Sequence, residues 1–272
     1  MGQQTIAFIA RATRFSPNSV GKDLAILSAV RRVLQHDGYT CADIVAEDVP
    51  QDIVEADAYV SMGRCQDTLN WLGQYERDGI PVVNCTASVM LCKMRRLQQN
   101  VLDEAGIPLP PHVGGNGYWV KRDYGYAETP YDVQYAPDHA AAQRIAGEMA
   151  LRGIPDVDIR AHVVGDLLKC YAVTGTDFFR YYYPGDDGLW KFSAEQHNGR
   201  PHHYPFDADA LHAMLQQAAA TLCLDVYGAD CIVRPDGSFV LVDLNDWPSF
   251  SRCIDEAAVP IAHRIRQEMR DE

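Results

Sequence analysis

Two strand-like segments near the C-terminus, joined by a tight turn, constrain the fold of this chain more than any other feature. Residues 227–233 are rich in β-branched residues, and residues 239–245 form a second apolar run. The residues between them, Pro235-Asp236-Gly237, have the composition of a turn. The sequence therefore predicts a β-hairpin.

Three oxygen-bearing side chains fall on this hairpin. Asp243 and Asn245 are two residues apart, so on a strand they point to the same face, and Asp230 on the partner strand can join them. Such a set suits Mg²⁺, which prefers a few protein oxygens together with nucleotide phosphates. The alternative is that the two aspartates are edge-strand acids that face water. Asn and Asp are depleted in strands, however, and this alternative leaves Asn245 unexplained.

The hairpin resembles the end of the nucleotide domain in the ATP-grasp superfamily. Those proteins carry an Asp on one strand, then an acidic residue and an Asn two residues apart on the next, followed by Pro and a small residue. Residues 245–249 here read Asn-Asp-Trp-Pro-Ser. The resemblance covers most of the chain and touches two branches, the carboxylate–amine ligases of the RimK type and the inositol phosphate kinases. It implies ATP and Mg²⁺ as cofactors, with two ions expected on the metal ligands Asp230, Asp243 and Asn245.

Composition limits the classes of protein that remain. The chain has 272 residues and is 47% hydrophobic, enough for two or three sub-domains with cores. A net charge of −13 argues against a nucleic-acid surface, and the apolar runs are too short to span a membrane. The eight cysteines include no CxxC pair, which favours reduced thiols in a cytoplasmic protein. We expect a small-molecule substrate, no nucleic-acid or membrane partner, and a chain that is compatible with a homo-oligomer.

Hydrophobic periodicity predicts the order of the elements. Strands at 5–10, 58–61 and 81–84, with helices over 23–36 and 68–77, indicate a small open parallel sheet. A helix over 94–105 ends at Gly106, with Pro108 just beyond. Short strands then alternate with helices over 140–151, 208–222 and 254–269.

The predicted fold class is therefore mixed α/β and α+β. A small N-terminal open parallel-sheet domain is expected over residues 1–107. The resemblance implies that an ATP-grasp domain of two α+β sub-domains follows over 108–272, with sub-domain limits near 108–152 and 153–272.

Several basic residues are candidates for the nucleotide phosphates. Lys121 alternates with apolar neighbours on the strand 119–122, and the resemblance implies a phosphate contact; the alternative is a solvated edge lysine. In the segment 93–96, Arg95 best matches the basic residue of the family and Lys93 competes with it, although an ordinary basic surface turn is also possible. Glu148 falls where the family contacts adenine. The loop 122–130 takes the place of a glycine-rich lid but has one glycine, so how the phosphates are covered stays open.

Three further groups are candidates for the chemistry. Alternation places Asp158 and Arg160 on one face of a strand; the resemblance implies that Asp158 lies in the nucleotide site and that Arg160 holds phosphate or an acyl phosphate. Arg180 lies among aromatic residues, where it either binds an anion or extends along the sheet, and it matches a catalytic arginine of the ligases. The turn after the metal ligands implies that Ser249 and Ser251 contact the acceptor substrate.

The resemblance implies an ATP- and Mg²⁺-dependent ligase that activates a carboxylate as an acyl phosphate for attack by an amine, because most ATP-grasp proteins act in this way. The alternative is a small-molecule kinase of the inositol phosphate kinase type, which phosphorylates a hydroxyl. A nucleotide-binding regulator without turnover is a third class, but a sensor does not need three metal ligands. The identity of the acceptor does not follow from the sequence, because acceptor pockets are built from variable loops.

Overall fold

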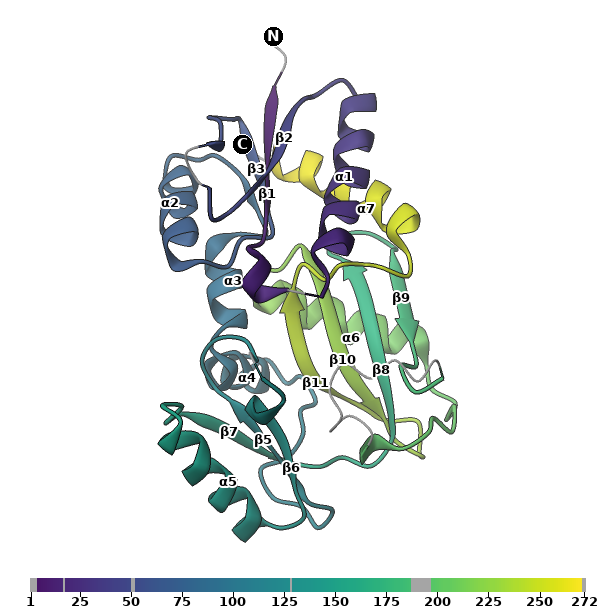
Figure 1. Ribbon diagram of the computed structural model, residues 1–272. Helices are drawn as coiled ribbons and strands as arrows, with labels where there is room; N and C mark the ends of the chain where they lie inside the picture. The colour runs from purple at the N-terminus through teal and green to yellow at the C-terminus, as the bar shows by residue number, and fades with distance from the viewer. Residues whose placement is uncertain (1–3, 17, 50–51, 128, 187–196, 271–272) are drawn as a thin grey trace.

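The fold of the chain is known from a computed structural model, which describes residues 4–16, 18–49, 52–127, 129–186 and 197–270 (Figure 1). The first sheet is parallel and four-stranded, in the order β2-β1-β3-β4. Its strands are β1 (Thr5–Ala10), β2 (Thr40–Ala46), β3 (Ala58–Ser61) and β4 (Val82–Val83). Helices α1 (Val20–His36) and α2 (Gln66–Arg77) connect them. This confirms the predicted open parallel sheet, although the sequence analysis did not predict the edge strand β2.

The second sheet is antiparallel and three-stranded, in the order β6-β5-β7. Its strands are β5 (Tyr118–Arg122), β6 (Val133–Ala136) and β7 (Val157–Ala161). Helix α5 (His139–Leu151) covers one face, where Met149 packs with Val120 and Ala161. Because side chains alternate along a strand, Lys121 lies on the opposite face.

The sub-domain limit expected near residue 152 precedes the last strand of the second sheet. Strand β7 pairs with β5, so the smaller sheet continues to Ala161. The expected limit lies at the end of helix α5, but β7 follows it and pairs with the edge of β5 that β6 leaves open.

The third sheet is antiparallel, in the order β11-β10-β8-β9, and carries the predicted hairpin. Its strands are β8 (Asp166–Val173), β9 (Phe179–Tyr182), β10 (Val226–Val233) and β11 (Phe239–Asp246). Gly237 has a φ of 82° in the β10–β11 turn, a conformation that glycine adopts without strain. Helix α6 (Ala208–Thr221) packs on one face through Leu211 and Leu215.

Three helices tie the sheets together. Helices α3 (Thr86–Cys92) and α4 (Arg95–Glu104) lead from the parallel sheet to β5, and the short 3₁₀ helices η1 (Thr13–Phe15) and η3 (Pro130–Asp132) lie in loops. Helix α7 (Ile254–Glu268) returns beside α1, as Figure 1 shows. Within the described residues, no helix combines the length and apolarity needed to cross a membrane.

Helix α7 shares one hydrophobic core with the N-terminal sheet. Ile261 and Ile265 pack in the same cluster as Leu27, Val30 and Phe8. The expected division at residue 107 therefore follows the order of the sheets, whereas the C-terminal helix helps to bury the first sheet's helix α1.

The shared core gives a first prediction. Ile261 is fully buried whereas Val259, on the same helix, is 55% exposed. Ile261→Ala should lower the free energy of unfolding by about 2–5 kcal/mol because it leaves a cavity. Val259→Ala should change it by less than about 0.5 kcal/mol. Urea unfolding of both variants measures the difference, and equal effects would show that α7 does not stabilise this core.

Candidate active site

The hairpin places its three oxygen-bearing side chains on one face of the third sheet. Asp230 lies directly opposite Asp243, and Asn245 lies opposite Gly228. Directly opposed residues of antiparallel strands project to the same side. On the next strand Lys169 lies opposite Asp230. The predicted common face is confirmed by this register, while the binding of a metal stays a prediction.

Asp243 receives two cations from outside its own sheet. Lys121 on β5 donates from Nζ to Asp243 Oδ2 at 3.0 Å, and Arg95 at the start of α4 donates to Oδ1. Asp243 is thus the point at which the second and third sheets meet. Lys93, the competitor of Arg95, instead donates to the carbonyl of Arg64 at 3.5 Å.

These cations control the charge of Asp243. Burial alone would raise the pKa of the carboxyl, but the charges of Arg95 and Lys121 outweigh it and hold the pKa far below the ordinary range. The same pairing raises the pKa of Arg95 in spite of its burial. Asp243 is therefore ionised at neutral pH, the state that a metal ligand requires.

Asp230 and Asn245, the other two residues of the predicted metal site, make fewer contacts than Asp243. Asp230 accepts from Lys169 Nζ at 3.2 and 3.3 Å. The amide of Asn245 makes no hydrogen bond within the described part of the chain. No group of three or more His, Cys, Asp or Glu residues in the described ranges is arranged to hold a metal, and the hairpin set contains two of these residues together with Asn245. Two carboxylates and a free amide oxygen, faced by lysine and arginine, fit Mg²⁺ together with phosphate.

The second sheet adds charged groups from the face opposite α5. Asp158 lies opposite Lys121, and Arg160 lies opposite Trp119. Arg160 donates from Nε to Asp158 Oδ1 at 3.1 Å, while Asp158 Oδ2 is buried without a hydrogen-bond partner. An unsatisfied buried carboxylate oxygen requires an explanation, and a ligand group that donates to it is one. Alternation predicted the common face of Asp158 and Arg160, and the strand pairing adds Lys121 to the same charged surface.

The loop 122–130 is anchored toward the N-terminal sheet. Tyr126 stacks over the Arg64 guanidinium, 4.0 Å from the ring centroid, and its hydroxyl lies 3.4 Å from Asp246 Oδ1. Its ring also packs against the ring of Phe15, with 5.6 Å between the two ring centroids. Position 128 lies outside the described residues. An aromatic contact, rather than glycine backbone, thus holds this loop.

The turn after the metal ligands is compact and partly strained. Trp247 and Phe250 are buried and have φ values of 32° and 47°, which non-glycine residues rarely adopt. Pro248 folds over Gly228, where a Cβ atom would lie 3.0 Å from its ring. Ser249 is half-buried and Ser251 is exposed on this turn, so their contact with an acceptor stays a prediction.

Two predicted site residues lie apart from the others. Glu148 is exposed on α5, the helix that covers the far face of the second sheet, so the structure does not support its contact with adenine. Arg180 lies on the edge strand β9, opposite Tyr171 and with two strands between it and β11, and it pairs with Glu256 at 2.5 Å. Its row of opposed residues continues through Tyr171 and Gly228 to Asn245, so its catalytic role stays a prediction.

Sequence reasoning gave no role to two residues that the structure brings to the site. Lys169 stands beside Asp230, where it is better placed than Arg180 to meet an anion. Gln98 on α4 donates to the carbonyl of Leu244 at 2.9 Å and so fixes the strand between the two metal ligands. Alternation along β8 carried a signal for Lys169, whereas nothing in the sequence indicated the contact of Gln98.

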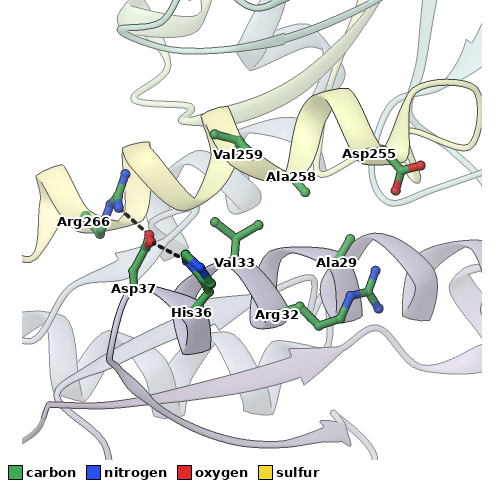
Figure 2. A pocket seen from close by; sticks show the side chains of 9 residues that line it. All are labelled: Ala29, Arg32, Val33, His36, Asp37, Asp255, Ala258, Val259 and Arg266. Atoms are coloured by element: carbon green, nitrogen blue, oxygen red, sulfur yellow. Dashed lines mark hydrogen bonds and ion pairs between the residues drawn. The ribbon is translucent and has the colours of Figure 1, made fainter.

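A separate hollow lies between α1 and α7. Figure 2 shows alanine and valine side chains in it, with Arg32 and Asp255 at one end and the Asp37–Arg266 pair at the other. Its volume is about 440 Å³. None of the predicted site residues lines it, so the junction of the second and third sheets is the candidate active site.

Comparisons with known proteins support the fold. No family model matches the sequence, and no curated protein matches it. D-alanyl-alanine synthetase A from Vibrio cholerae superposes with a TM-score of 0.71 at 10% identity, covering 100% of both chains. VanG D-Ala:D-Ser ligase from Enterococcus faecalis gives 0.68 at 12%, covering 98% of this chain and 100% of that one. A RimK domain ATP-grasp protein from Sphaerobacter thermophilus gives 0.65 at 16%, covering 96% and 99%. The chain has the ATP-grasp fold.

The depressed pKa of Asp243 gives a prediction about acid stability. The unfolded carboxyl titrates near pH 3.9, above the folded group, so the unfolded chain binds the proton first. The stability that Asp243 contributes is present above about pH 4 and is lost as the pH falls further. Asp243→Asn should therefore flatten the dependence of the unfolding free energy on pH below about 4, by up to ~1.4 kcal/mol per pH unit.

Urea unfolding at stepped pH measures this slope. Asp103→Asn, at an exposed position on α4, is the matched control and should keep the wild-type slope. An unchanged slope in Asp243→Asn would mean that the ion pairs of Asp243 do not govern its titration.

Proposed function

We propose that this protein is an ATP- and Mg²⁺-dependent ligase that activates a carboxylate as an acyl phosphate, which an amine then attacks. The observation that carries the proposal is the convergence of Lys121, Arg95 and Lys169 on the two carboxylates Asp230 and Asp243. The fold is consistent with it, since three of the structural neighbours are a D-alanyl-alanine synthetase, a D-Ala:D-Ser ligase and a RimK domain protein. A fold of this kind supports several chemistries, so the residues must carry the argument.

The ion pairs around Asp243 suggest how the nucleotide is received. Without nucleotide, Lys121 and Arg95 neutralise the carboxylate directly. With nucleotide, the phosphates become the partners of these cations, and Asp230, Asp243 and the Asn245 amide are left to hold Mg²⁺. The ion supplies charge neutralisation to the transferred phosphoryl group. One set of side chains thus serves both states with little movement.

The remaining roles follow from position. Arg160, paired with Asp158 on the same face as Lys121, is placed to stabilise the transferred phosphoryl group. The unpaired Oδ2 of Asp158 accepts a hydrogen bond from the nucleotide. Ser249 and Ser251 border the metal ligands and donate to the acceptor acid. Arg180 pairs with Glu256 at the surface and shares a cross-strand row with Asn245, so its contact with the transferred phosphoryl group stays a prediction.

The third prediction concerns the nucleotide phosphates. Lys121→Met keeps an apolar stem but removes the charge, so it should weaken ATP binding by about 2 kcal/mol, the scale of a charge-assisted contact. Lys22→Met, at an exposed position on α1, should leave the affinity unchanged. Calorimetry with ATP and Mg²⁺ measures both. An equal affinity in the two variants would make Lys121 a partner of Asp243 only.

The fourth prediction separates the ligase from a kinase. ADP should form from ATP and a pool of carboxylic acids only when an amine is also supplied, because the acyl phosphate must be consumed for turnover. Asp243→Asn should abolish this ADP formation while the thermal melt still shows a folded protein. ADP formation with a polyol and no amine would favour the kinase instead. The aromatic residues Trp247 and Phe250 of the acceptor turn resemble the corresponding turn of the inositol phosphate kinases.

A further inference from the structure

Three arginines follow the carboxyl ends of two strands in the parallel sheet. Arg11 and Arg14 come directly after β1, and Arg64 comes shortly after β3. In open α/β sheets, ligands bind outside the carboxyl ends of the strands. A cluster of positive charge at this edge stands out in a chain with a net charge of −13.

A buried carboxylate holds the two loops of this edge in place. Glu47, just after β2, accepts hydrogen bonds from the backbone N–H groups of Ala12 at 2.7 Å, Arg64 at 2.6 Å and Cys65 at 2.6 Å. Glu47 is 3% exposed. The arginines therefore project from a fixed frame and not from loose loops.

The same edge faces the acceptor turn, residues 247–251. Arg64 binds both carboxylate oxygens of Asp246, at 3.0 and 2.9 Å, and Arg11 donates from Nη2 to the carbonyl of Trp247. Asn84 at the end of β4 donates to the carbonyl of Val226 at 2.8 Å. The arginines thus lie next to the end of the strand that carries Asn245.

Arg64 is fully engaged by Asp246, but Arg11 is not fully engaged. The side chain of Arg11 is 8% exposed, and its Nε makes no hydrogen bond within the described residues. Among the described residues its ion-pair partner is Asp23, whose buried Oδ2 lies 3.4 Å from Arg11 Nε without forming a hydrogen bond. The guanidinium therefore keeps hydrogen-bonding capacity that this ion pair does not use.

Arg14 is an exposed neighbour on η1. Among the described residues it pairs with no carboxylate, and it donates to the sulfur of Cys65. Burial and the charge of Arg64 lower the pKa of Arg11 to about 10, so Arg11 still carries its charge at neutral pH.

We propose that Arg11 and Arg14 bind a second oxyanionic group of the acceptor, a carboxylate or a phosphate, so that the acid which the enzyme activates is a dianion. This inference rests on the proposed function, because the acceptor turn is its point of reference. The acceptor lies with one carboxylate near Lys169 and the metal ligands and with its other anionic group at the edge of the parallel sheet. A guanidinium suits that group because it offers two parallel donors to one oxyanion.

The test compares three probes of equal length. Glutarate and 4-phosphonobutyrate carry a carboxylate at one end and a second anionic group at the other. Pentanoate has a chain of the same length with a carboxylate but no second anionic group. Calorimetry in the absence of nucleotide should give at least about tenfold tighter binding for one of the two dianions than for pentanoate, as expected for a charge-assisted contact. The dianion that binds more tightly identifies the group.

Variants then locate the contact. Arg14→Met should remove most of this preference, as should Arg11→Met combined with Asp23→Asn, which leaves no unpaired buried charge. Arg32→Met, at an exposed position on α1 in the hollow of Figure 2, is the control and should keep the preference. With ATP and an amine present, Arg14→Met should raise KM for the dianion about tenfold and leave KM for ATP unchanged.

The outcomes separate this inference from the proposed function. Equal affinity for the dianions and pentanoate would overturn it, as would an Arg14→Met protein that behaves like Arg32→Met. If the double variant Arg11→Met, Asp23→Asn does not fold, the affinities of Arg14→Met alone decide whether the inference holds. An absence of ADP formation with every acid would contradict the ligase, while the nucleotide-free binding would still decide whether an oxyanion binds here.

Discussion

The ion pairs of Asp243 with Arg95 and Lys121 are the interaction on which the rest of this account depends. They join three elements that are distant in the sequence: α4, β5 and β11. A carboxylate that is largely shielded from water is costly unless charged partners compensate it. The chain supplies two such partners, Arg95 and Lys121, and both are cations that can bind a phosphate in place of the carboxylate. The same contact therefore stabilises the folded chain and, in our proposal, prepares it for nucleotide.

A second buried pair connects this site to the N-terminal sheet. Arg64 is held by Glu47 at its backbone and by Asp246 at its side chain, and Tyr126 of the loop 122–130 lies over it. Asp246 directly follows Asn245, so this ion pair joins the edge of the parallel sheet to the end of the strand with the predicted metal ligands. Helix α7 adds a hydrophobic contact between the two ends of the chain. The N-terminal sheet is consequently part of the active-site structure and suited to carry acceptor contacts.

The sequence was most informative where local pattern and chemistry coincide. The predicted hairpin placed Asp230, Asp243 and Asn245 on one face, and alternation placed Asp158 and Arg160 on another, because the period of a strand is fixed. It was less informative where tertiary contacts decide. The exposed helix position of Glu148, the Glu256 partner of Arg180 and the assignment of β7 to the second sheet all depend on pairings between distant segments. Edge strand β2, which is only partly buried, carries a weak hydrophobic pattern and was missed for that reason.

The most direct test is a crystal structure of the protein with Mg²⁺ and a non-hydrolysable ATP analogue. The account predicts that the phosphates lie between Lys121 and Arg95 on one side and Asp230 and Asp243 on the other, with the metal on Asp230, Asp243 and Asn245. The direct ion pairs of Asp243 should then be replaced by contacts of the same cations with phosphate oxygens. A nucleotide bound elsewhere, for example in the hollow between α1 and α7, with the pairs of Asp243 intact, would contradict the account.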